Sequence, residues 1–229
     1  IISLFSGCGG ADLGVVGGFS YLGKRYRKNA VEIIHASDVD SKAVATYNLN
    51  FTHDAITEDV NNLKFKKGDA DIVVGGFPCQ AFSTVNPTKI PEKRDNQLFW
   101  QMANVVCKVR PRMFIAENVK GFYRLSGGKY FDLARQEFER QGYNVFYKLI
   151  NSSDYGVPQK RERLFMIGID NKLHKTFEFP GPKYGPESFR KKPKVTLKEV
   201  IDSLEPEDEK YYFSERAVEG VKRAKSNMK

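Results

Sequence analysis

The sequence predicts an α/β fold with a doubly wound, mostly parallel sheet, and two patterns support this prediction. Short apolar segments rich in β-forming residues alternate with segments of helical spacing along most of the 229 residues. Hydrophobic residues make up 41% of the chain and aromatic residues 13%, which is enough for a sizeable core and excludes wholesale disorder. Because crossovers between parallel strands are right-handed, the alternation restricts the topology to doubly wound arrangements.

Six segments are expected to be strands, because each is short, apolar and rich in β-forming residues. In chain order they are Ile1–Phe5, Val31–Ser37, Asp71–Gly75, Met113–Glu117, Val145–Ile150 and Arg163–Ile169. Four segments between them have the apolar spacing of helices with one buried face. These are Ala11–Phe19, Ser41–Asn50, Gln97–Val109 and Tyr130–Gln141. Residues 1–170 are therefore expected to form one domain.

The composition changes from about Asn171 onwards. Four prolines and two glycines between residues 180 and 193 interrupt any regular element, so we expect an extended arm that leaves the domain. Two short helices are expected beyond it, over Val195–Leu204 and Ser214–Lys225, the second with Ser214 as its N-cap. Residues 171–229 are thus assigned to a separate region.

Charge and cysteine content limit the classes of partner. Lys and Arg number 37 against 28 Asp and Glu, a formal net charge of +9, which favours polyanions, although charge alone is equally compatible with a basic protein without such a partner. The three cysteines are odd in number and far apart, and the three histidines are scattered. We therefore expect no disulfide framework, no metal site and a reducing compartment. No apolar run approaches the ~18 residues that a membrane span needs. The chain opens directly in a strand, so we expect no secretory signal and a piece of a longer polypeptide.

A glycine-rich loop follows the first expected strand, in the segment Phe5–Gly14. Glycines at a strand-to-helix turn let the backbone approach a nucleotide-like ligand. The next strand ends near Asp38, whose carboxylate can bind ribose hydroxyls. The glycine spacing does not match the pattern of NAD-binding loops. Together these features predict a site for another ribonucleoside cofactor.

Three further segments place reactive groups beside expected strands. Cys79 follows the strand Asp71–Gly75 in the loop Gly-Gly-Phe-Pro-Cys-Gln, where a thiolate can act as a nucleophile. Cys107, inside an apolar helix, fits a buried inert cysteine better. Glu117 ends a hydrophobic strand, where partial desolvation raises a carboxyl pKa towards a value useful for proton donation. Arg161 and Arg163 alternate towards one face and suit a phosphate or a base carbonyl.

The motifs FSGCGGADLG, GGFPCQAFS, ENV and QKRER, in this order and spacing, resemble those of the DNA (cytosine-5) methyltransferases, in particular bacterial modification enzymes of restriction systems. The resemblance covers roughly Ile1–Asp170. It implies the Rossmann-like fold of S-adenosylmethionine-dependent methyltransferases, with residues 1–170 as the catalytic and cofactor-binding domain. Residues 171–229 would then hold the arm and the start of a target-recognition region.

The resemblance also implies a role for each motif residue. The residues around S-adenosylmethionine would be Phe5, Ser6, Gly7, Cys8, Gly10, Asp38, Val39, Asp59, Val60, Pro78 and Leu98. Those on the substrate side would be Phe77, Gln80, Ser83, Asn118 and Gln159. Many relatives carry a large aromatic residue at the position of Val39, so weaker stacking on adenine is expected here.

In the implied reaction, the thiolate of Cys79 adds to carbon 6 of a cytosine that has been flipped out of double-stranded DNA. This addition comes first because carbon 5 is a poor nucleophile until the thiolate has added. Glu117 contacts ring nitrogen 3 and the exocyclic amine and protonates the ring as the thiolate adds. Arg163 contacts the base carbonyl, with Arg161 as support. Carbon 5 then attacks the methyl group of S-adenosylmethionine. Loss of the carbon 5 proton and of the thiol restores the aromatic ring.

The resemblance has departures that leave alternatives open. The late motifs of the family, including an Asn-Ser-Val helix that completes the cofactor pocket, do not occur in the sequence. We therefore expect either a fragment or one part of an enzyme completed by a second polypeptide. A transfer-RNA cytosine methyltransferase shares the core but typically carries a Cys-Phe-Thr tripeptide that is absent here. A non-catalytic DNA-binding module is the third possibility. For the leading interpretation we expect double-stranded DNA as partner and the bacterial cytoplasm, at the nucleoid, as location.

Overall fold

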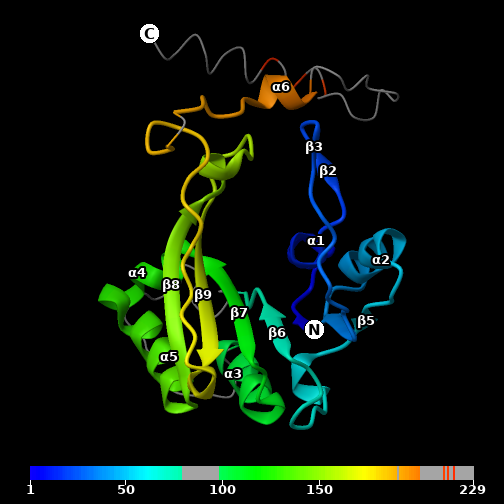
Figure 1. The fold of residues 1–229 in the computed structure, drawn as a ribbon. Coiled ribbons are helices and arrows are strands. Elements are labelled where there is room, and N and C mark those ends of the chain that lie inside the picture. Colours follow the sequence, from blue (N-terminus) through cyan, green and yellow to red (C-terminus); the bar gives the residue numbers. More distant parts are fainter. Residues whose placement is uncertain (79–97, 190, 202–213, 215, 217–218, 220–229) are drawn as a thin grey trace.

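The structure is a computed structural model that describes residues 1–78, 98–189 and 191–201 and the single positions 214, 216 and 219. Within these residues, seven strands form one sheet in the order β5-β4-β1-β6-β7-β9-β8 (Figure 1). Strand β9 is antiparallel to both of its neighbours, and the other pairings are parallel. The predicted mostly parallel α/β sheet is thus confirmed. The strands are β1 (Ile2–Leu4), β4 (His35–Asp38), β5 (Ile56–Thr57), β6 (Ile72–Gly75), β7 (Met113–Val119), β8 (Tyr143–Asn151) and β9 (Glu162–Asp170).

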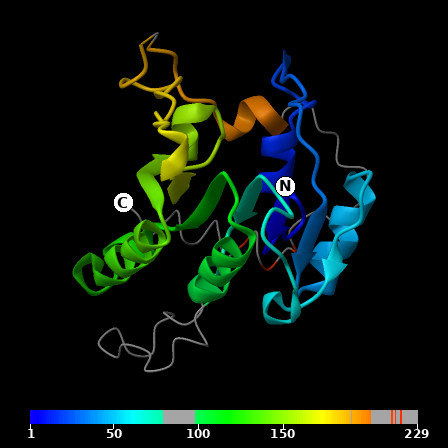
Figure 2. The ribbon, with the colours of Figure 1, turned by 60° about the horizontal axis from the view of Figure 1, so that its bottom comes forward.

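Helices cover both faces of this sheet, as Figures 1 and 2 show. One buried cluster joins α3 (Leu98–Val109), α4 (Lys120–Arg124) and α5 (Lys129–Arg140) to the sheet through residues such as Val73 and Phe114. A second cluster joins α1 (Gly10–Val16) and α2 (Ser41–Asn50) to the other face through Val74 and Ile115. Consecutive strand residues therefore enter different cores, which is why these strands read as continuous apolar segments in the sequence.

The strand order reverses beside β1. From β1 the chain proceeds to β4 and β5 on one side, and β6 and β7 lie on the other side. In open α/β sheets the loops after the strands diverge at such a point and leave a crevice outside the carboxyl ends of the strands. The loops that follow β1, β4, β6 and β7 carry most of the predicted site residues, so the topology brings them to one edge.

Some expected elements are shorter than predicted, and two differ by several residues. The strand expected over Val31–Ser37 covers only His35–Asp38, and the helix expected over Ala11–Phe19 spans Gly10–Val16. That helix ends at Val16 because Gly17 and Gly18 follow with positive φ values of 70° and 81°. Of the expected helix Ser214–Lys225 only positions 214, 216 and 219 are described, and of Val195–Leu204 the structure shows α6 (Leu197–Ile201).

The expectation for Cys107 was wrong, because its side chain is exposed. Helix α3 buries a wide stripe that includes Met102, Val105, Val106 and Val109. Position 107 falls on the remaining solvent face, because successive residues are rotated by about 100° around a helix. Apolar neighbours in the sequence do not by themselves bury a helical residue.

A short hairpin, β2 (Ser20–Tyr21) and β3 (Lys24–Arg25), was not predicted and projects beyond the carboxyl edge of the sheet (Figure 1). On the other side of the crevice, the connection from β8 to β9 contains the short helix η5 (Ser152–Tyr155). Beyond η6 (Asn171–Leu173), the described residues contain no helix or strand until α6. No helix among the described residues is long and apolar enough to cross a membrane.

Candidate active site

Two adjoining pockets occupy the carboxyl edge of the sheet. The outer pocket has a volume of about 320 Å³ and the inner pocket about 430 Å³, and both are lined by Phe5 and Gly76. The other residues of the outer pocket are Ser37, Asp38, Val39, Asp40, Glu58, Asp59, Val60, Pro78 and Leu98. The inner pocket is completed by Ser3, Leu4, Ser6, Gly10, Ala11, Val74, Gly75, Ile115, Glu117, Ser152, Arg161, Arg163 and Phe165. One elongated ligand can therefore extend from the outer pocket into the inner one.

The glycine loop between β1 and α1 forms the boundary between the pockets. Phe5 has a φ of 53°, in the left-handed region that a bulky residue rarely adopts. The backbone N–H of Gly7 donates to Asp38 Oδ2 at 2.8 Å, and the N–H of Asp40 donates to the other carboxylate oxygen at 3.0 Å. Asp38 thus anchors the loop and still lines the outer pocket.

A buried polar network supports the glycine loop from below. Asp12, only 1% exposed, accepts hydrogen bonds from the Ser3 and Tyr47 hydroxyls, each at 2.7 Å. The Ser6 hydroxyl donates to the Ser3 carbonyl at 3.2 Å and accepts from the Ser37 backbone at 3.1 Å. Burial, and then the hydrogen bond to the Asp12 carboxylate, raise the pKa of Tyr47 far above its ordinary value. The tyrosine therefore remains a neutral donor that fixes Asp12 and with it the start of α1.

Glu117 and Arg163 form an ion pair in the wall of the inner pocket. Arg163 Nε lies 2.9 Å from Glu117 Oε1, and the two side chains are 21% and 31% exposed, respectively. Burial raises the pKa of the Glu117 carboxyl above its ordinary value, and the positive charges of Arg163 and Arg161 only partly oppose this effect. A partly desolvated carboxyl beside two guanidiniums can exchange a proton with a bound heterocycle.

The neighbouring Asn118 holds the loop after β6. Its side-chain Nδ2 donates to the Phe77 carbonyl at 3.0 Å, and its own oxygen accepts from the Val119 backbone at 2.7 Å. Asn118 is buried, and the phenyl ring of Phe77 packs in the core against Phe99 and Phe122. The carboxyl end of β7 therefore fixes the backbone at Phe77, immediately before Pro78.

Comparison with known proteins decides the family. The profile of the C-5 cytosine-specific DNA methylases matches residues 1–229 of the chain. The chain belongs to this family.

Bacterial relatives of the chain are type II methyltransferases. M.BspRI of Lysinibacillus sphaericus is 35% identical over 230 residues, which cover 93% of this chain and 54% of M.BspRI. M.AquIA of Picosynechococcus is 34% identical, with 90% of this chain and 89% of M.AquIA covered. The chain thus spans about half the length of M.BspRI but most of M.AquIA.

The chain shares its fold with solved methyltransferase structures. A prophage-encoded DNA modification methyltransferase from E. coli is 25% identical with a TM-score of 0.67, over 90% of this chain and 55% of that protein. The Dnmt2 methyltransferase of S. pombe superposes with a TM-score of 0.66 at 21% identity, over 97% of this chain and 65% of that protein. The second likeness concerns the fold alone.

The structure brings most of the predicted site residues together, but not all. The two pockets contain Phe5, Ser6, Gly10, Asp38, Val39, Asp59, Val60, Pro78, Leu98, Glu117, Arg161 and Arg163. Gly7 lies behind them as a backbone donor to Asp38, Cys8 is exposed, and Gln159 is exposed in the turn before β9. Cys79, Gln80 and Ser83 lie outside the described residues.

Several pocket residues were not singled out from the sequence. Glu58, beside the predicted Asp59, lines the outer pocket, and Ser152 lines the inner one. The acidic pair Glu58-Asp59 follows a segment too short to be recognised as a strand, and Ser152 begins η5 directly after β8. The Asp12–Tyr47 bond joins residues 35 positions apart. The sequence held one signal for Glu58 and Ser152, which is that each follows the end of a strand.

Proposed function

We propose that this chain carries the catalytic and cofactor-binding part of an enzyme that methylates carbon 5 of cytosine in double-stranded DNA, with S-adenosylmethionine as methyl donor. The observation that carries the proposal is the Glu117–Arg163 pair in the inner pocket, which adjoins an outer pocket lined by acidic and apolar residues. Family membership supports the reaction class. The bacterial relatives support a type II modification role, in which methylation would protect host DNA from a restriction enzyme.

The residues of the outer pocket fit an adenosine group. The carboxylates of Asp38 and Asp59 are acceptors for ribose hydroxyls and for the adenine amine, and Val39 and Leu98 supply apolar surface for the ring. Val39 is 67% exposed, which leaves its side chain free to pack on a ligand. The methionine end would then extend past Phe5 to Ser6 and Gly10 in the inner pocket. Bound there, S-adenosylmethionine supplies an electrophilic methyl group.

The inner pocket supplies the groups that activate the base. Glu117, with its raised pKa, donates a proton to the ring when the thiolate of Cys79 adds to carbon 6. Arg163 stabilises negative charge that develops on the base carbonyl and orients Glu117 through their 2.9 Å contact. Arg161 adds a second positive charge at the opening. In the sequence Cys79 directly follows Pro78, which lines the outer pocket, and this adjacency supports its assignment as the nucleophile.

Completion by further polypeptide is part of the proposal. Because the chain spans 54% of M.BspRI, the surface that selects the target sequence would come from residues outside these 229. M.AquIA, of which 89% is covered, is a relative of comparable length. We expect the chain alone to bind S-adenosylmethionine weakly and to methylate DNA only when the complementary part is supplied, either in the same polypeptide or as a second one.

The deciding experiment uses DNA that contains 5-fluorocytosine. Fluorine at carbon 5 cannot leave as a proton does, so a cysteine nucleophile remains covalently attached to the base. The completed protein should form an adduct that survives denaturation, and the adduct should be absent in Cys79→Ser. Calorimetry with S-adenosylhomocysteine on the 229 residues tests the cofactor pocket separately. A methylating enzyme without an adduct would overturn the mechanism, and absence of both methylation and cofactor binding would overturn the proposal.

A further inference from the structure

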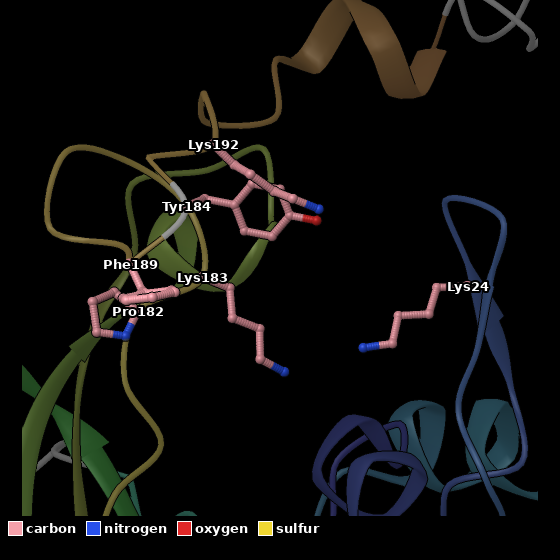
Figure 3. Close-up of a pocket in the computed structure, with 6 residues that line it drawn as sticks. All are labelled: Lys24, Pro182, Lys183, Tyr184, Phe189 and Lys192. Atoms are coloured by element: carbon pink, nitrogen blue, oxygen red, sulfur yellow. The ribbon is translucent and has the colours of Figure 1, made fainter.

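A third pocket, of about 380 Å³, opens between the β2–β3 hairpin and the arm that follows η6 (Figure 3). Lys24 extends from the hairpin, and Lys183 and Lys192 extend from the arm into the same opening. Tyr184, Pro182 and Phe189 form the rest of its lining, and Phe189 is fully exposed. None of these residues belongs to the motifs from which the family was inferred.

The hairpin is built to present Lys24 at its tip. Leu22 and Gly23 have φ values of 46° and 71°, as a two-residue turn with both central residues in the left-handed region requires. Tyr21 pairs directly with Lys24, so their side chains share one face of the hairpin. The Tyr21 hydroxyl donates to the Gly156 carbonyl at 3.1 Å, which turns that face towards the β8–β9 connection.

The arm is fixed to the same connection. The backbone N–H groups of Lys183 and Tyr184 donate to the Asp154 carbonyl at 2.8 and 3.0 Å, and Lys194 Nζ lies 2.8 Å from the Asp154 carboxylate. Gly156 has a φ of 98°, and a methyl group at its α-carbon would lie 2.8 Å from the Tyr184 ring. Gly156 is therefore the point where hairpin, arm and connection meet. The inner pocket lies at the other end of this connection, where Ser152 and Arg161 line it.

The positive charge of this pocket is not neutralised by described residues. Lys24, Lys183 and Lys192 are exposed, and none has an ion pair with a described acidic side chain. Lys194, which is paired with Asp154, provides the contrast. Exposed Arg25, Arg27 and Lys28 continue the charge along the hairpin.

We propose that the hairpin–arm pocket binds the sugar–phosphate backbone of double-stranded DNA beside the inner pocket. Three separate ammonium groups on flexible stems suit successive singly charged phosphates of a strand, whereas a free nucleotide is normally held by clustered backbone N–H groups or an arginine fork. Exposed Phe189 and Tyr184 add surface for sugars. The proposal rests on the proposed function for its choice of DNA, and it assigns backbone contacts to residues outside the catalytic motifs.

The test measures the salt dependence of DNA binding for the 229-residue chain by fluorescence anisotropy with a labelled duplex of about 20 base pairs. The variant carries Lys24→Gln, Lys183→Gln and Lys192→Gln. The control carries Lys64→Gln, Lys67→Gln and Lys108→Gln, which remove the same charge from exposed positions near the opposite, amino edge of the sheet. Each lost phosphate contact lowers the slope of log K against log salt by about 0.9, so we expect a decrease of roughly 2–3 for the pocket variant and well under 1 for the control.

Thermal melting and S-adenosylhomocysteine binding accompany each measurement. Equal loss of slope in both triple variants, or an unchanged slope in the pocket variant, would overturn the proposal. The proposal would also be overturned if ATP displaced the duplex from the native chain at about tenfold lower concentration than from the pocket variant. The pocket would then be a nucleotide site. The expected slope loss without S-adenosylhomocysteine binding would refute the proposed cofactor pocket and leave the DNA surface standing.

Discussion

Glu117→Gln tests the proposed acid in isolation, because the amide keeps the shape of the side chain and its ability to hydrogen-bond. Loss of a general acid costs about 10²–10⁴-fold in rate, which corresponds to about 2.7–5.4 kcal/mol of transition-state stabilisation. The Arg163 contact at 2.9 Å is partly open to solvent, so its loss should change the free energy of unfolding by no more than about 1 kcal/mol. Rate and stability should therefore respond very differently.

The pH dependence of stability gives a second readout of Glu117→Gln. Burial raises the pKa of Glu117 in the folded protein, so the stability that this group contributes is fully present below its unfolded pKa and is lost as pH rises through the folded value. The free energy of unfolding of the Gln variant should therefore increase relative to that of the native protein as the pH rises from acidic to neutral. Urea unfolding at several pH values, with the same chain, measures this difference.

Glu139→Gln is the matched control. Glu139 lies on α5, with its Oε1 2.7 Å from Arg135 Nη1, in an ion pair remote from both pockets. The assay is single-turnover transfer of a tritiated methyl group by the completed protein, and Glu139→Gln should retain the native rate. If Glu117→Gln transferred methyl groups within about threefold of native protein, Glu117 would be only a polar residue at the end of a strand.

Three further substitutions test the loops around the pockets. Cys79→Ser should abolish methyl transfer and covalent trapping but leave S-adenosylhomocysteine binding unchanged, and appreciable turnover would exclude Cys79 as the nucleophile. Asp38→Ala should weaken S-adenosylhomocysteine binding about 10–100-fold in calorimetry, because a ligand acceptor and the anchor of Gly7 are both lost; an unchanged affinity would place the ribose elsewhere. Gly9→Ala should destabilise the chain by more than about 2 kcal/mol in urea unfolding, since the added methyl would lie 2.2 Å from the Phe51 ring at a φ of 88°; equal stability would contradict this packing.

Much of the fold could be predicted from the sequence, because central strands buried on both faces read as apolar segments. Strands β6 and β7 follow this rule. In β6, for example, the consecutive residues Val73 and Val74 enter separate cores. The glycine loop and Asp38 were expected to meet because the carboxyl ends of adjacent parallel strands share an edge, and Gly7 indeed donates to Asp38. The site predictions that the structure supports were thus those based on residues at the ends of strands.

Features that depend on local turns or long-range side-chain contacts could not be predicted. The β2–β3 hairpin contains two residues in each strand and a Leu-Gly turn in place of a typical Asn-Gly pair. Phe77 was assigned to the substrate side by its place in a motif, whereas its ring packs in the core and its carbonyl is held by Asn118. In both cases the tertiary environment decides the outcome, and no periodicity in the sequence reports it.

The direction of β9 explains how a charged strand start reaches the site. In a parallel strand, Arg163 would lie at the amino edge, opposite the glycine loop. Because β9 is antiparallel to β7, Arg163 pairs with Val119 at the carboxyl end of β7, and Phe165 pairs with Glu117. Glu117 and Arg163 are then diagonal neighbours on one face of the sheet, within reach of a long side chain. The reversed strand is therefore what joins the acid to its guanidinium, and the same reversal requires the β8–β9 connection, with Gly156, to stand at the edge where the hairpin and the arm meet it.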